Sequence, residues 1–263
     1  VESFSEFNKS TTSSSTVAEQ AVKIEANCKK PNKKRIEEVL KIVFLLIFFG
    51  KLIHFFQFMA FTPLIIIIII TTLVSLHAMR DDRVFDTLHF SAYRIKHDKE
   101  YHRFITNILI HADLPHLIFN MFSLYFLGEF FELVMVATYG VILGEFHFLT
   151  IYLLGGLFAN LYAYMRHQDD PNYRSVGASG AVSAIIFAVI IWVPDLPLNL
   201  MFIPIPIPAY IFGVIYLAFE YYAHKKGNTG IAHDAHIGGA VLGIVYVLIL
   251  NIDKGKEFLG HFF

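Results

Sequence analysis

The sequence predicts an all-α membrane protein, a bundle of six transmembrane helices with a long membrane-associated loop between the first and second helices. The chain of 263 residues is 56% hydrophobic and only 16% charged, and its mean hydropathy is +0.55. A soluble domain of this length would need more polar residues to cover its surface. Apolar stretches of near-spanning length follow one another at residues 62–79, 114–138, 146–165, 175–193, 208–222 and 232–250.

The chain before the first of these stretches has a different composition. Residues 1–35 are rich in Ser and Thr and then in Lys, without apolar periodicity, which predicts a disordered extension. The run 39–60 is apolar but interrupted by charged and polar residues, so an interfacial helix is favoured over an additional span. The single cysteine, Cys28, is interpreted as incidental. We therefore expect two parts, an extension of residues 1–58 and a helical domain of residues 59–263.

Two connections between the stretches are unusual. Residues 80–113 form a polar segment too long for a simple turn, and its short apolar patches predict a unit that folds against the membrane surface. Before the fifth stretch, Pro204, Pro206 and Pro208 alternate with Ile, which removes backbone donors and disfavours a helix. We expect this segment to be extended and the fifth helix to begin late, with a loose anchor.

Polar side chains inside the stretches are costly in a bilayer and usually face a cavity or a partner. Alternate spans cross in the same direction, so the N-terminal ends of the second, fourth and sixth helices lie on one side. Polar residues near these ends should meet at one depth, because a helix rises by about 1.5 Å per residue. Ser179 and His236 are each expected about one turn into a helix. The residues expected at this depth are His116, Asn120, Ser179 and His236.

Ser179 and His236 have the surroundings of a nucleophile and its base. Ser179 lies in Gly177-Ala178-Ser179-Gly180, whose small residues let a substrate chain approach the hydroxyl. A lone membrane serine more often bonds its own helix. His236 begins the pattern His236-x-x-Gly239-x-x-x-Gly243, which predicts close packing against the fourth helix. Such packing would bring the imidazole within reach of the hydroxyl, which needs a base to become a nucleophile.

Acyl transfer also requires donors for the oxyanion. His116 and Asn120 are four residues apart on one helix face and can present an imidazole N–H and a carboxamide N–H. The backbone N–H of Ser179 could add a third donor. Asp234 would project away from His236, so we interpret it as a helix N-cap. The preferred arrangement is a Ser–His dyad, with a water or a backbone group orienting the imidazole.

These residues resemble the rhomboid intramembrane serine proteases. The similarity covers residues 59–263 and rests on His111-x4-His116-x3-Asn120, Gly177-Ala178-Ser179-Gly180 and Ala235-His236-x2-Gly239-x3-Gly243. It implies a serine endopeptidase with Ser179 as nucleophile, His236 as base, and His116 and Asn120 as oxyanion donors. The implied substrates are single-span membrane proteins, admitted by a gate at the fifth helix. No metal or organic cofactor is implied, and similarity to bacterial members implies the bacterial inner membrane.

The same resemblance assigns supporting roles and shows two departures. It implies that His111 lies on the loop side of the site and that Arg103 and Glu132 brace the long loop and the second helix. The family's Trp-Arg pair in that loop is His102-Arg103 here. A tyrosine often found four residues after the serine is Ser183 here, so support for the imidazole must come from elsewhere.

Three other functions compete with this interpretation. A zinc enzyme could use His111, His116, His233 and His236, but the sequence has no H-E-x-x-H motif and no carboxylate that matches them in the bundle. An inactive rhomboid-like binder of membrane proteins would not be expected to keep a nucleophile, a base and oxyanion donors together. A transporter would be expected to have charged residues in mid-span. The net charge of -1 gives no indication of nucleic-acid binding.

Overall fold

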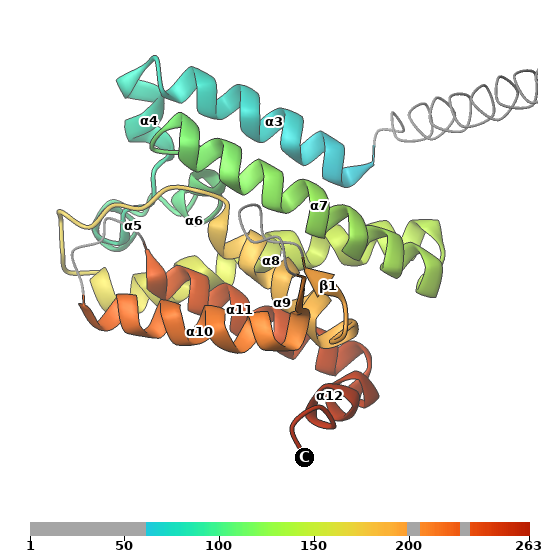
Figure 1. The fold of residues 1–263 in the computed structure, drawn as a ribbon. Coiled ribbons are helices and arrows are strands. Elements are labelled where there is room, and N and C mark those ends of the chain that lie inside the picture. The colour runs from blue at the N-terminus through green and yellow to red at the C-terminus, as the bar shows by residue number, and fades with distance from the viewer. Residues whose placement is uncertain (1–61, 199–205, 227–231) are drawn as a thin grey trace, which may run out of the picture. The chain divides into compact units, whose positions relative to one another are not determined.

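The computed structural model describes residues 62–198, 206–226 and 232–263. The predicted extension 1–58, the run 39–60 and Cys28 lie outside the described residues, as does Pro204. In the described part, helices dominate (Figure 1).

Each of the six predicted stretches contains a helix in the structure. Among the described residues, three of these helices, α7, α8 and α11, are long and apolar enough to cross a membrane by length and composition. Helices α3 and α9 are apolar but shorter. The predicted helices are therefore confirmed, whereas six complete membrane crossings stay a prediction. The bounds are α3 (Pro63–Ala78), α7 (Leu114–Tyr139), α8 (Val141–His167), α9 (Ser179–Trp192), α10 (Ala209–Lys226) and α11 (His233–Leu250).

Local chemistry explains where several helices begin. The side chain of Thr62 accepts a hydrogen bond from the Ile65 N–H, and a proline follows it at the first position of α3. Asp113 caps α7 in the same way, because its carboxylate accepts the His116 N–H at 2.7 Å. Gly140 has φ +81° and connects α7 to α8 without further loop residues. A short helix that the sequence did not predict, α12 (Ile252–Leu259), follows α11.

Helix α9 forms the centre of the described domain. All of its residues after Ser179 are buried, and its main neighbours are α11, α8 and α7. A helix that is hydrophobic all round is typical of a protein core or of a membrane span, and here the neighbouring helices cover it. Ser179, its first residue, therefore stands at the end of a helix that is buried along its length.

The segment between α3 and α7 is a folded unit, as predicted. It contains α4 (Asp82–Leu88), α5 (Ala92–His97), α6 (Arg103–Thr106) and the 3-10 helix η1 (Asn107–Leu109). It has a small hydrophobic core of its own, in which Phe90 and Ile95 pack with Ala163 of α8. The predicted contact of this unit with a membrane surface stays a prediction.

The proline-rich connection before α10 is extended where the structure describes it. Ile207–Pro208 form strand β2, which pairs in antiparallel register with β1 (Pro197–Leu198). The expectation of a loosely anchored fifth helix is wrong. The first backbone N–H groups of α10, from Ala209 and Tyr210, donate to the carbonyls of Leu196 and Pro194 at 2.9 and 3.0 Å. These bonds satisfy donors that a helix leaves open at its start.

Candidate functional site

Ser179 is the first residue of α9, and Ala178 is the N-cap. The expectation that Ser179 lies one turn inside the helix is therefore wrong. The chain enters α9 through Gly177, which has φ +117°, a conformation that side chains rarely adopt. A Cβ atom at Gly177 would lie 2.7 Å from Cε1 of His116. The glycine thus lets the turn before Ser179 pass directly under the His116 ring.

The turn before Ser179 is attached to the folded loop at three points. Ser175 and Phe90 exchange two backbone hydrogen bonds of 2.9 and 3.2 Å. The Gly177 N–H donates to the Asn107 carbonyl at 3.0 Å. The Ala178 N–H donates to Nε2 of the buried His111 at 3.3 Å. His111 is therefore on the loop side of the site, where the family resemblance expected it, and it holds the residue next to Ser179.

Close packing of α11 on α9 brings the start of α11 to Ser179, as the glycine pattern predicts. A Cβ atom at Gly239 would collide with the Gly180 carbonyl oxygen, and one at Gly243 with the Ala184 carbonyl oxygen. Only glycine permits this approach of two backbones. His236 completes the first turn of α11, as predicted, and directly follows Ala235, which shares a pocket with Ser179.

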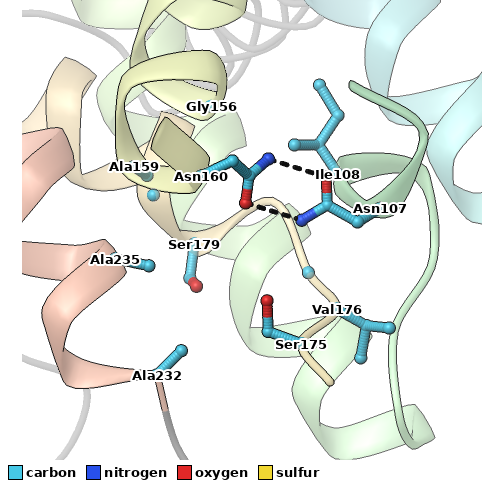
Figure 2. Close-up of a pocket in the computed structure, with 12 residues that line it drawn as sticks. Asn107, Ile108, Gly156, Ala159, Asn160, Ser175, Val176, Ser179, Ala232 and Ala235 are labelled. Carbon is cyan, nitrogen blue, oxygen red and sulfur yellow. Dashed lines mark hydrogen bonds between the residues drawn. The ribbon is translucent and has the colours of Figure 1, made fainter. Parts of the chain in front are cut away.

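The pocket beside Ser179 lies between α8, α9, α11 and the folded loop. Figure 2 shows Ser179 facing Ala232 and Ala235 at the start of α11. On the opposite wall, the carboxamides of Asn107 and Asn160 exchange hydrogen bonds of 3.0 and 2.7 Å. This reciprocal pair satisfies two buried amides and fixes η1 to α8. The lining residues are Asn107, Ile108, Gly156, Ala159, Asn160, Ser175, Val176, Gly177, Ser179, Gly180, Ala232 and Ala235.

His116 and Asn120 lie in the first two turns of α7, on the same side of the fold as Ser179 and His236. The His116 ring lies directly against Gly177. The Asn120 carboxamide donates one N–H to the His116 carbonyl at 3.0 Å. A carboxamide has two N–H groups, so this bond leaves a second donor. Gly177 and Ala235 thus place the His116 ring and the start of α11 near Ser179. Among the described residues no hydrogen bond joins Ser179 to His236, so the meeting of all four side chains stays a prediction.

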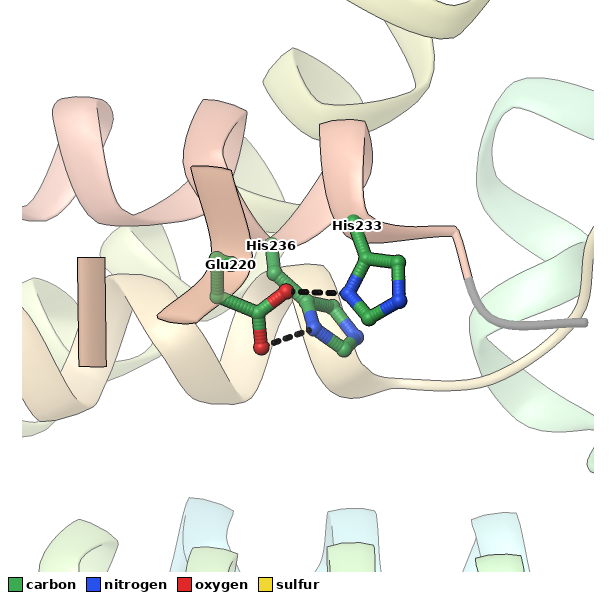
Figure 3. A group of neighbouring side chains, drawn as sticks. All are labelled: Glu220, His233 and His236. Carbon is green, nitrogen blue, oxygen red and sulfur yellow. Dashed lines mark hydrogen bonds and ion pairs between the residues drawn. The ribbon is translucent and has the colours of Figure 1, made fainter. Parts of the chain in front are cut away.

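Glu220 of α10 is the functional candidate that the sequence interpretation missed. Its side chain is 6% exposed, and its two oxygens bond Nδ1 of His233 at 2.6 Å and Nδ1 of His236 at 3.0 Å. Figure 3 shows one oxygen of the carboxylate directed at each ring. The expected water or backbone group for His236 is thus replaced by a carboxylate. A signal existed, since Glu220 is the only acidic residue in the apolar stretch 208–222.

One reason given against a zinc enzyme, that the bundle has no carboxylate to match the histidines, is wrong. The bundle does contain a carboxylate beside two histidines, and the nearest ligand atoms of Glu220, His233 and His236 lie within 4.8 Å of one another. The four histidines considered as ligands do not form one cluster, because His111 and His116 pair with each other near Gly177. The bond lengths of 2.6 and 3.0 Å are those of hydrogen bonds from both rings to the carboxylate.

Asp234 is not the N-cap of α11, and this interpretation is wrong. The N-cap is Ala232, which has no side-chain oxygen, and Asp234 lies inside the first turn. Its carboxylate is buried, accepts the Ala235 N–H at 2.9 Å and lies 3.7 Å from Nε2 of His167 on α8. The expectation that Asp234 points away from His236 agrees with this contact.

Three supporting residues have identifiable partners. Arg103 is 2% exposed and donates to the carbonyls of Asp86 and His89 at 2.7 and 2.8 Å and to the Glu100 carboxylate. Glu132 of α7 accepts the Leu64 N–H of α3 at 3.4 Å. Ser183, at the position of the family's tyrosine, bonds the hydroxyl of Tyr216 from α10 at 2.9 Å. Helix α10 thus reaches both α9 and α11 through polar side chains.

The fold and the site define a helical membrane protein whose polar groups gather where three of its helices begin. Comparison with known proteins gives the family. The model of the rhomboid domain matches residues 98–252, and the chain belongs to the rhomboid family.

Several relatives share part of this chain. RHOMBOID-like protein 12, mitochondrial, of Arabidopsis thaliana is 29% identical over 170 residues, which are 59% of this chain and 47% of that protein. The human Presenilin-associated rhomboid-like protein, mitochondrial, is 31% identical over 143 residues, 52% of this chain and 35% of its own length. Rhomboid protease AarA of Providencia stuartii is 27% identical over 193 residues, 64% and 65% of the two chains.

The chain thus covers less than two thirds of the length of each of these relatives. Two of the three have mitochondrial names, so these relatives do not support the expected bacterial inner membrane.

Proposed function

We propose that the chain is an intramembrane serine endopeptidase that cleaves transmembrane segments of other membrane proteins. Single-span proteins are the proposed substrates and the lipid bilayer is the medium, with no role for nucleic acid or metal. The proposed protease domain is residues 59–263, with six membrane crossings. The observation that carries the proposal is the position of Ser179 at the first residue of α9, facing the start of α11, where His236 lies.

In the proposed reaction, Oγ of Ser179 attacks the scissile carbonyl carbon while His236 takes the hydroxyl proton. The negative charge develops on the former carbonyl oxygen. Backbone N–H groups in the first turn of a helix have no intrahelical partner, so the Ser179 N–H is available to this oxyanion. His116 and Asn120 of α7 are proposed as further donors.

Collapse of the tetrahedral intermediate breaks the peptide bond. The nitrogen of the leaving chain takes the proton from His236, and the other half of the substrate stays on Ser179 as an ester. Water then attacks the ester with His236 as base, and the acid product leaves with Ser179 regenerated. No cofactor enters this sequence of steps.

An inactive rhomboid-like binder is the alternative function, and one experiment separates the two. The purified full chain in proteoliposomes is offered a model single-span substrate and a fluorophosphonate probe. We expect the wild type to cleave and to label, and Ser179→Ala to do neither while still accumulating as a folded protein. His236→Ala should lower turnover by several orders of magnitude. Labelling that survives Ser179→Ala would contradict the proposed nucleophile, and a wild type that binds substrate without cleavage would establish the binder.

A further inference from the structure

The carboxylate of Glu220 decides which nitrogen of His236 carries the proton. An ionised carboxylate only accepts hydrogen bonds. Since Oε1 of Glu220 lies 3.0 Å from Nδ1 of His236, the proton of the neutral ring is on Nδ1. Nε2 then keeps a free electron pair. A serine nucleophile needs this tautomer, because the base must accept its proton through the nitrogen turned away from the carboxylate.

The surroundings of Glu220 are those of a built site. A carboxylate buried inside a membrane helix is expensive unless partners surround it. Glu220 has two, the rings of His233 and His236. One turn earlier on α10, the hydroxyl of Tyr216 bonds Ser183 on α9. The carboxylate is therefore held from α10 and α11 together and has little freedom to leave His236.

We infer that Glu220 is a positioning residue for catalysis, the third member of a Ser179–His236–Glu220 arrangement in which α10 supplies the carboxylate. The inference rests on the proposed function of Ser179 and His236. Glu220 fixes the tautomer and orientation of His236 and stabilises the imidazolium that forms when the ring takes the serine proton. Because the carboxylate belongs to α10, the site is complete only while α10 is docked on α11.

A purely structural role for the same contacts predicts something different. The shorter bond of Glu220 is to His233, and both bonds connect α10 to α11. If Glu220 only braced these helices, loss of the His233 bond would impair the protein as much as loss of the His236 bond. Substitutions that separate the two bonds therefore test the inference.

The central variant is Glu220→Gln, an isosteric change that removes the charge and places an amide beside Nδ1. The amide N–H can donate to Nδ1 and favour the wrong tautomer. We expect kcat for the model substrate to fall by about 10²-fold to 10⁴-fold. KM should stay within about threefold, because the buried carboxylate does not touch the substrate. Glu220→Asp keeps the charge on a shorter side chain, and its kcat should be at least about tenfold higher than that of Glu220→Gln.

The matched control is His233→Leu. Leucine has no donor for the other oxygen of Glu220, so this variant loses the His233 bond while the His236 bond can remain. We expect it to lose less than about tenfold in kcat. Equal losses in His233→Leu and Glu220→Gln would overturn the inference in favour of a structural brace. If Glu220→Gln does not accumulate, Glu220→Asp and His233→Leu are compared alone, and the same ordering of kcat is required.

Two further outcomes separate this inference from its premises. If Ser179→Ala abolishes activity but Glu220→Gln keeps kcat within about threefold of the wild type, the proposed protease stands and the role of Glu220 fails.

The second outcome concerns a metal bound at the same side chains. We expect dialysis against a strong zinc chelator to leave wild-type kcat unchanged. Loss of activity that added Zn²⁺ restores would replace the hydrogen-bonded arrangement with a metal held by Glu220, His233 and His236.

Discussion

The backbone N–H of Ala178 donates to Nε2 of His111 over 3.3 Å, and Nδ1 of the same ring lies 3.0 Å from the hydroxyl of Ser75. The Ser75 hydroxyl gives its own proton to the Leu109 carbonyl at 2.9 Å. His111 must therefore carry its proton on Nδ1, which leaves Nε2 free to accept from Ala178. One fully buried imidazole thus joins α3, the folded loop and the residue next to Ser179.

The stability of the protein should fall as His111 becomes protonated in the unfolded chain. Burial lowers the pKa of His111 to about 3, from an ordinary value of 6.5. Between these values the unfolded chain binds a proton that the folded chain does not. The stabilisation is complete above about pH 6.5 and is lost as the pH falls towards 3, by at most about 1.4 kcal/mol per pH unit.

Thermal unfolding in detergent from pH 7.5 to 4.5 measures this effect. His111→Gln keeps an acceptor for the Ala178 N–H but does not titrate, so its apparent Tm should be lower at pH 7.5 and should decline less on acidification. Parallel curves for the two proteins would contradict a neutral, buried His111.

Gly177 should be essential to the site in a way that Gly140 is not. Both have a positive φ, +117° and +81°, so alanine strains the backbone at either position by roughly 1–3 kcal/mol. At Gly177 the added methyl would also meet the His116 ring at 2.7 Å, whereas at Gly140 nothing lies within 4 Å. We expect Gly177→Ala to abolish fluorophosphonate labelling and Gly140→Ala to keep most of it. Equal labelling would show that the contact with His116 is not required.

The sequence predicts the close packing of α11 on α9 because the signals are local and periodic. Gly239 and Gly243 lie on one helix face with His236, and this pattern alone predicts close packing on α9, which the structure has. The common depth of His116 and His236 follows from the alternating direction of successive helices. Arguments of this kind need only helix geometry and the order of the spans.

The parts that could not be predicted depend on contacts between distant residues. Glu220 is 16 residues before His236 and approaches it only because α10 and α11 pack side by side. Its position as an acidic residue in an apolar stretch is a signal of function that the sequence interpretation missed. That signal does not say which histidine the carboxylate meets. The start of α9 at Ser179 was also missed, because the apolar composition continues through the extended residues before it and hides the turn at Gly177.

Arg103 should hold the folded loop in place more strongly than its neighbour Arg94. The guanidinium of Arg103 is 2% exposed and serves two backbone carbonyls and a carboxylate. Arg94 is 33% exposed and pairs with Asp86 at 2.8 Å. Lysine keeps the charge but lacks the planar set of donors. We expect Arg103→Lys to lower the apparent Tm by several degrees, while Arg94→Lys changes it by about one degree, since exposed ion pairs contribute little. A larger change at Arg94 would contradict this ranking.

Gly239 and Gly238 are adjacent on α11 and provide the sharpest test of how His236 is positioned. A methyl group at Gly239 would collide with the Gly180 carbonyl oxygen, one residue after Ser179, and would push α11 away from α9. At Gly238 the nearest atom to an added methyl is the Cα of Ala159 at 3.3 Å, a contact that small shifts can relieve. Both substitutions raise helix propensity by the same amount, so propensity cancels in the comparison.

We therefore expect Gly239→Ala to lower both the apparent Tm and kcat, by at least about 10²-fold in kcat, because a displacement of about 1 Å between nucleophile and base has this effect. Gly238→Ala should keep kcat within about tenfold of the wild type. Cleavage of the model substrate and the apparent Tm are measured on the same preparations. If Gly239→Ala remains as active as Gly238→Ala, the contact of the two backbones does not set the distance between Ser179 and His236, and the packing of α11 on α8 must do so instead.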